Sequence, residues 1–90
     1  MNREIALRLM EEELRKLRKL PYEGFLKVLD KVSTTTLQGS DGKTYQLECI
    51  AFWDSKTGGN IRVMVCVDDG GLKAFKPLSG GFIISPVGFS

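Results

Sequence analysis

Hydrophobic residues near the start of the chain recur at the spacing of an α-helix. Between residues 2 and 19 they are separated mostly by three or four positions, so they form one apolar stripe. The stripe consists of Leu7, Met10, Leu14 and Leu17, widened by Ala6 and Leu20. Asn2 is suited to cap this helix. Leu20-Pro21 ends it, because the residue before a proline avoids helical dihedral angles.

A second, shorter helix is expected from Pro21 to about Asp30. Proline is favoured in the first turn of a helix, where its missing N–H costs no hydrogen bond. The buried side of this helix would contain Phe25, Leu26 and Leu29. The segment 28–32 is an alternative start for a strand, because it begins and ends with β-branched valines.

After residue 32 the pattern changes from helical spacing to strands and turns. Four hydroxyl residues, Ser33–Thr36, favour a half-exposed strand. Gly39–Gly42 follow as a hairpin turn, in which Asp41-Gly42 suits a type I′ pair. The alternation that begins at Tyr45 then predicts an antiparallel sheet.

The stretch from Tyr45 to Pro77 organises this sheet. It contains two long strands joined by a glycine-rich turn at residues 55–60, and a third strand, Leu72–Pro77, after a second turn. Phe82-Ile83-Ile84 is a further apolar segment and a candidate fifth strand, and residues 86–90 form a tail.

The pairing of the two long strands decides which side chains share a face. If Asp54 pairs with Ile61, then Ile50 lies opposite Val65 and Phe52 lies opposite Val63. This aliphatic face would receive the stripe of the first helix. The other face would carry Tyr45, Leu47, Cys49, Ala51, Trp53, Met64, Cys66 and Phe75.

This second face is more apolar than the open face of a one-sided sheet should be. Its cover is either the C-terminal segment, with Phe82, Ile83, Ile84, Val87 and Phe89, or a partner such as a second copy of the chain, another protein or a small apolar ligand. The candidate interface or ligand residues are Tyr45, Trp53, Arg62, Met64 and Phe75. Trp53 and Arg62 would face each other across the hairpin as a cation–π pair.

Composition excludes several kinds of catalytic site. The 90 residues include no histidine, so a Ser–His or Cys–His pair cannot form within the chain. No residues match a phosphate-binding loop or a dinucleotide fingerprint, and no cofactor or metal site is indicated. Asp68-Asp69 precedes glycines and fits a turn better than a pair of catalytic carboxylates. We therefore expect a protein that is not an enzyme.

Two cysteines and the absence of a signal peptide favour a reduced, cytoplasmic setting. In the register above, Cys49 and Cys66 lie directly opposite each other, within reach of a disulfide. We expect both to stay reduced and to pack as small hydrophobic side chains. Glu48 would lie on the aliphatic face, near its end or paired with Arg15 or Lys19 of the helix.

A group of basic residues lies at the end of the first helix and beyond it. It contains Arg15, Lys16, Arg18, Lys19, Lys27 and Lys31. The acidic run 11–13 offsets part of this charge, and the net charge of the chain is only +2. Nucleic-acid binding is therefore a minor alternative, since it is usually accompanied by a large basic excess. No apolar run is long enough to cross a bilayer, so no membrane role is expected.

Several segments resemble a group of small bacterial proteins of similar length. The matching segments are Leu20–Glu23 (LPYE), Asp41–Glu48 (DGKTYQLE), Phe52–Asp54 (FWD) and Asp68–Gly71 (DDGG), followed by Phe75, Pro77 and Leu78. The resemblance covers most of the chain and implies an α+β fold. It implies no activity and no functional residues.

Together these patterns predict one α+β domain over residues 1–90. A helical segment, 1–31, would pack on one face of an antiparallel meander of four to five strands, 32–85, followed by a tail, 86–90. The expected function is a non-enzymatic interaction or accessory module that forms a homodimer through the second face of its sheet. The alternatives are a small-molecule site between the sheet and the C-terminal segment, and a nucleic-acid adaptor that uses the basic helix end.

Overall fold

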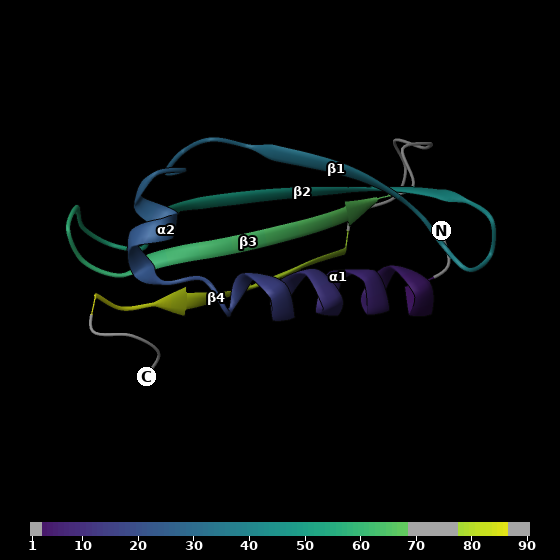
Figure 1. The fold of residues 1–90 in the computed structure, drawn as a ribbon, viewed down its shortest axis with the longest axis horizontal. Helices are drawn as coiled ribbons and strands as arrows, with labels where there is room; N and C mark the ends of the chain where they lie inside the picture. The colour runs from purple at the N-terminus through teal and green to yellow at the C-terminus, as the bar shows by residue number, and fades with distance from the viewer. Residues whose placement is uncertain (1–2, 69–77, 87–90) are drawn as a thin grey trace.

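Two helices precede a four-stranded antiparallel sheet in the computed structural model, which describes residues 3–68 and 78–86 (Figure 1). The elements are α1 (Arg3–Leu17), α2 (Tyr22–Leu26), β1 (Ser33–Gln38), β2 (Thr44–Trp53), β3 (Ile61–Asp68) and β4 (Leu78–Ile84). The strands lie side by side in chain order, β1-β2-β3-β4. The predicted α+β architecture, with a helix on an antiparallel meander, is confirmed. The Asn2 cap, the strand Leu72–Pro77 and the end of the tail lie outside the described residues.

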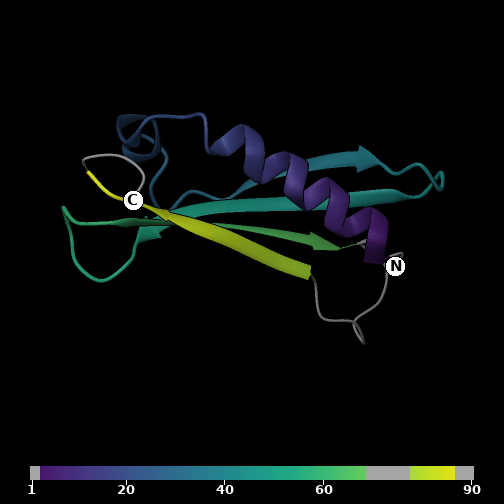
Figure 2. The ribbon, with the colours of Figure 1, turned by 90° about the horizontal axis from the view of Figure 1, so that it is seen from below.

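Helix α1 lies across one face of the sheet, over β3 and β4 (Figure 2). Its buried residues are Ala6, Met10 and Leu14, each four positions after the last, with Ile5 and Leu9 beside them. The predicted stripe is confirmed for Ala6, Met10 and Leu14, and Leu17 packs against the same core, whereas Leu7 and Leu20 are exposed. The acidic and basic side chains that alternate with this row remain on the solvent side of the helix.

The chain turns sharply after α1 and returns to the sheet through α2. The predicted second helix is present, but Pro21 has extended dihedral angles and is its N-cap rather than a first-turn residue, and α2 ends at Leu26 rather than near Asp30. Phe25 is buried, but Leu26 is 41% exposed, so the predicted buried side of α2 was only partly right. The residues after α2 make one bridge to the sheet rather than a strand: Leu29 pairs with Ala51, and the backbone N–H of Asp30 donates to the Ala51 carbonyl at 2.8 Å.

The hairpin between β1 and β2 closes through a type I turn followed by a left-handed glycine. The Gly42 N–H donates to the Gly39 carbonyl at 3.0 Å, and Gly42 has φ of +81°. Asp41 does not have a positive φ, so the predicted type I′ pair was wrong. Its carboxylate instead accepts hydrogen bonds from the Tyr45 hydroxyl at 2.8 Å and from the Lys43 backbone N–H at 3.1 Å.

These contacts affect the titration of Asp41. Desolvation raises the pKa of the Asp41 carboxyl, but the hydrogen bonds from Tyr45 and Lys43, together with the Lys43 charge, outweigh it and hold the pKa below its ordinary value. The carboxylate thus ties the turn to the buried Tyr45 ring.

The register of the long hairpin differs by one residue from the prediction. Trp53, not Asp54, pairs with Ile61, and the Asp54 N–H donates to the Asn60 carbonyl at 2.9 Å inside the connecting loop. The Asp54 carboxylate also binds the Arg62 guanidinium of β3. A shift of one residue moves every partner to the other face. Ile50 therefore lies opposite Met64 and Phe52 lies opposite Arg62, and the predicted pairs with Val65 and Val63 were wrong.

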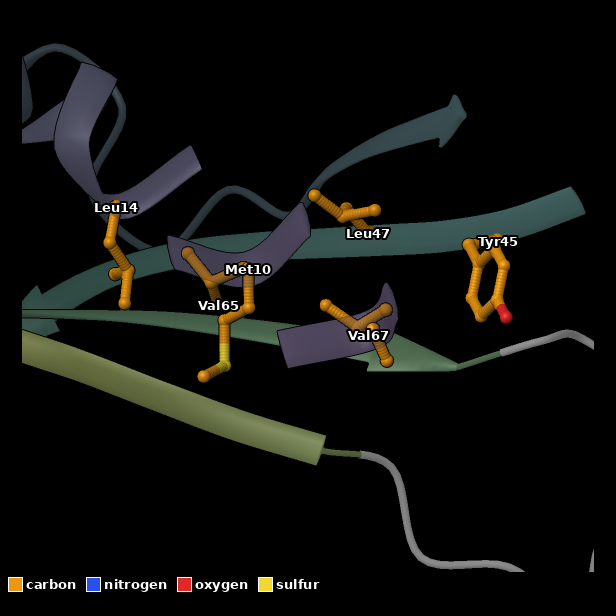
Figure 3. Packing of buried hydrophobic residues seen from close by; sticks show 7 residues of the cluster. Met10, Leu14, Tyr45, Leu47, Val65 and Val67 are labelled. Carbon is orange, nitrogen blue, oxygen red and sulfur yellow. The ribbon is translucent and has the colours of Figure 1, made fainter. Parts of the chain in front are cut away.

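The shift reverses the assignment of the two faces of β2. The face under α1 carries Tyr45, Leu47, Cys49, Ala51 and Trp53 from β2, with Ile61, Val63, Val65 and Val67 from β3. Figure 3 shows Met10 and Leu14 of α1 over Leu47, Val65 and Val67. Ile50 and Phe52 point to the other side. Burial decides the assignment, since the four aliphatic residues of β3 on the helix side are all fully buried.

The core consists of two clusters that meet beneath the end of α1. One lies between α1 and the first half of β2, and the other gathers around Phe25, Ala51 and Ile84. Leu17, Cys49 and Phe82 pack against both. Phe25 and Phe82 meet edge to face with their ring centroids 6.1 Å apart, and the Arg18 guanidinium lies 5.4 Å from the centre of the Phe82 ring.

Candidate interaction face

The side of the sheet opposite α1, called the open face below, is covered by no helix or strand of the described residues (Figure 2). Three rows of side chains cross it from β4 through β3 to β2. The rows are Ile83–Arg62–Phe52, Gly81–Met64–Ile50 and Ser79–Cys66–Glu48, the last continued by Thr34 of β1. The first two rows, together with Cys66 of the third, supply the apolar centre.

The apolar centre of the open face consists of Ile50, Phe52, Met64, Cys66 and Ile83. All five side chains retain solvent exposure, and Ile83 is the most open of them at 38%. Polar residues surround this centre: Thr34, Thr36, Gln46, Glu48, Arg62, Asp68 and Ser79. An apolar centre within a polar rim is the anatomy of a protein–protein interface.

Arg62 is held in place at one end of the open face. Its Nε and one of its terminal nitrogens both lie 2.9 Å from Asp54 Oδ1. Arg62 also lies directly opposite Phe52 on the neighbouring strand. The predicted pairing of Arg62 with Trp53 was wrong, because these two side chains point to opposite sides of the sheet.

The candidate residues chosen from the sequence are divided between the two faces. Met64 and Arg62 lie on the open face, as predicted for an interface. Tyr45 is 0% exposed beneath α1, and Trp53 packs against the cluster around Phe25. Phe75 lies outside the described residues. Sequence reasoning missed Ile50, Phe52 and Ile83, although the alternation of β2 had already separated Ile50 and Phe52 from Tyr45 and Trp53.

The C-terminal segment does not cover the open face within the described residues. Phe82 and Ile84 of β4 point toward α1 and are partly or fully buried there, and only Ile83 points the other way. Gly80 of this strand lies under the helix, and a Cβ at this position would lie 3.1 Å from the end of the Met10 side chain. Of the two covers considered for the second face, the C-terminal segment is excluded for residues 82–84, which belong to a strand as the sequence also allowed. Val87 and Phe89 lie outside the described residues.

The two cysteines lie on opposite faces and are both free. Cys49 pairs with Val65 beneath α1, whereas Cys66 pairs with Glu48 on the open face, so the predicted cross-strand contact between them does not form. Burial raises the pKa of the Cys49 thiol, with a further contribution from Glu13, and burial together with Glu48 and Asp68 raises that of Cys66. Both thiols are therefore protonated and weakly nucleophilic near neutral pH.

Among the described residues, the charged side chains away from the open face form no recognisable centre. Glu48 lies on the open face rather than on the helix side, so it cannot pair with Arg15 or Lys19 as predicted. The basic side chains at the end of α1 are exposed, and one of them, Arg18, lies over Phe82. Residues 3–68 and 78–86 contain no group of three or more Cys, Asp or Glu placed to hold a metal ion. None of the helices in this part of the chain is long and apolar enough to cross a membrane.

A hollow of about 220 Å³ lies on the helix side of the sheet, between α1, α2, β1 and β2. Its lining is mainly apolar, with Leu17, Phe25, Cys49 and Ala51 around it. Glu13, Lys31 and Ser33 supply the polar part of the lining.

Comparison of the chain with protein-family models, with curated proteins and with solved structures found no match. The resemblance to small bacterial proteins therefore stays an expectation from the sequence.

Proposed function

We propose that this protein is a non-enzymatic interaction module that forms a homodimer by packing the open faces of two sheets together. The observation that carries the proposal is the apolar centre of that face, Ile50, Phe52, Met64, Cys66 and Ile83, within a polar rim. Exposed apolar patches of this kind usually mark interaction sites. A cytoplasmic setting is part of the proposal, because both cysteines are free thiols in the fold.

A second copy is the occupant favoured by the charge of the face. A face whose charges all had the same sign would repel a second copy of itself across a two-fold axis. The open face instead carries Glu48 and Asp68 as well as Arg62. Arg62 is paired with Asp54 at 2.9 Å, but its side chain is still 43% exposed and so can also face a carboxylate of a second copy. A rim with charges of both signs does not match nucleic acid or a strongly charged protein partner.

The size of the face sets the expected strength of the dimer. Four strands about 4.8 Å apart and about seven residues long at 3.3 Å each span roughly 450 Å² in projection. Stable interfaces of standard size bury about 800 Å² of accessible surface per partner. The pleated surface exceeds its projection, but the interface is still at the small end of the range. We therefore expect association in the micromolar range.

Sedimentation equilibrium from low micromolar to submillimolar concentration tests the proposal. The wild-type protein should shift from monomer to dimer over this range. Ile83→Glu places a charge in the apolar centre and should leave a monomer at every concentration, with an unchanged circular dichroism spectrum. Leu26→Glu is the matched control, since Leu26 is similarly exposed, at 41%, but lies on α2.

Two results would overturn the proposal. A wild-type protein that stays monomeric over the whole range excludes the homodimer. A dimer that persists in Ile83→Glu, or that is lost equally in Leu26→Glu, shows that the copies meet elsewhere, such as along the outer edge of β1.

A further inference from the structure

We propose that the hollow between α1, α2 and the sheet is a binding site for a small neutral apolar compound, of the size of one aromatic ring or a short alkyl chain. This site lies on the opposite side of the sheet from the open face and does not depend on the proposed dimer. Its location also differs from the small-molecule site expected from the sequence, between the sheet and the C-terminal segment.

The hollow exists because the helices leave a gap over β2. Helix α1 covers β3 and β4 and ends at Leu17, and the chain then turns away before α2 returns with Phe25. The two core clusters meet at this point, with Leu17 and Cys49 common to both. Both residues line the hollow, together with the buried Ala51. Small side chains at 49 and 51 thus leave the floor of the gap unfilled.

Volume limits the size of the occupant. Dry apolar cavities of about 150 Å³ bind benzene, and pockets for drug-sized ligands begin at about 300 Å³. The volume here is about 220 Å³, between these values. One substituted ring or a short chain fits, and a larger ligand does not.

The polar lining favours a neutral occupant. One carboxylate, Glu13, and one ammonium group, Lys31, belong to the lining, and their charges offset each other. Glu13 is close enough to Cys49 to raise the pKa of its thiol. A charged ligand of either sign would be attracted by one of these two groups and repelled by the other, so no net charge of the lining offsets the cost of desolvating it. The exposed Leu20 and Val28 extend the apolar lining to the surface and provide an entrance.

The position of the two cysteines allows a direct test. In Cys66→Ser, the remaining thiol at Cys49 lines the hollow, and its rate of reaction with dithiobisnitrobenzoate reports access to it. Cys49→Ser carries the matched control thiol, Cys66, on the opposite face. Toluene, indole and 1-hexanol are the probes, and benzoate and benzylamine are their charged counterparts.

The neutral probes should slow modification of Cys49 and leave that of Cys66 unchanged. Because the ligand-free fraction falls as 1/(1 + [L]/Kd), a probe at about ten times its Kd should slow the reaction about tenfold. Amide resonances of Gly24, Phe25 and Ala51 should shift with the same concentration dependence.

Filling the hollow should abolish the effect. Ala51→Leu adds a side chain at its floor. Gly24→Leu adds a side chain at the wall of the hollow. A Cβ at Gly24 has no neighbouring atom closer than 3.7 Å, so this variant can be used if Ala51→Leu does not fold. The proposal is overturned if no neutral probe changes the Cys49 rate or the amide shifts up to its solubility limit. It is also overturned if benzoate or benzylamine binds as tightly as toluene, or if Cys66 is protected equally.

Discussion

Replacing Leu47 and Ile50 separately by alanine tests which face of β2 forms the core. Both substitutions shorten a branched four-carbon side chain to a methyl group in the same strand. Leu47 is 2% exposed and packs in the cluster with Met10 and Val65, whereas Ile50 lies on the open face opposite Met64. The two variants therefore differ mainly in what surrounds the deleted atoms.

The expected losses in the free energy of unfolding differ several-fold between the two variants. Truncation of a buried leucine costs about 2–5 kcal/mol, since transfer free energy is lost and a cavity remains. Ile50 has neighbours on its own sheet but no described element above it, so its truncation should cost about 1 kcal/mol or less. A domain of this size has a total stability of roughly 5–13 kcal/mol. Leu47→Ala should thus lower the melting temperature by about 10–20 °C, and Ile50→Ala by only a few degrees.

Urea unfolding followed by Trp53 fluorescence and circular dichroism measures both free energies. It should be done at a concentration well below the dimer dissociation constant, because association would add apparent stability that Ile50→Ala removes. Equal losses of stability in the two monomeric variants would refute the register. A larger loss in Ile50→Ala would mean that α1 covers the opposite face.

Two further predictions concern the β1–β2 hairpin. The pKa of Asp41 is lowered in the fold, so its contribution to stability is fully present above its unfolded pKa of about 3.9 and is lost as pH falls through the lower folded value. Tyr45→Phe removes one cause of this lowered pKa. The urea unfolding midpoint of this variant should therefore change less between pH 5 and pH 2.5 than that of the wild type. If both proteins show the same dependence of the midpoint on pH, the Tyr45 hydroxyl does not act on Asp41. Gly39→Ala should destabilise the protein by about 1–3 kcal/mol, because a Cβ there would lie 2.6 Å from the Tyr45 ring and 2.9 Å from Ile5. Gly24→Ala, which meets only ordinary contacts in α2, should be neutral or stabilising, and a loss at Gly24 equal to that at Gly39 in thermal melts would contradict the crowding argument.

The sequence was sufficient to predict the elements but not their pairing. Helical spacing located α1, Pro21 located the start of α2, and alternation located β2 and β3. The predicted register was wrong because it depends on the number of residues in the loop, and nothing in the sequence showed that β2 ends at Trp53 rather than at Asp54. A pattern of apolar residues on both sides of β2 could not decide which side α1 would cover.

The sequence was also insufficient to show which residues lie together on the open face. Sequence reasoning correctly required a second apolar face and placed Met64 and Arg62 on it, but it combined them with Tyr45 and Trp53 from the other side. The hollow beside Cys49 carries no sequence signal, since it results from the direction in which the chain leaves α1.

The contact between Met10 of α1 and Gly80 of β4 determines when the core can form during synthesis on the ribosome. It joins the first helix to the last strand of the described chain, so the core cannot close until nearly all of the sequence has been synthesised. Until then α1 presents its apolar row, and β3 lacks its neighbour on one edge. Non-local contacts of this kind slow folding and lengthen the time during which such surfaces are exposed. We therefore expect the nascent chain to expose apolar surface for longer than a helical bundle of equal length would.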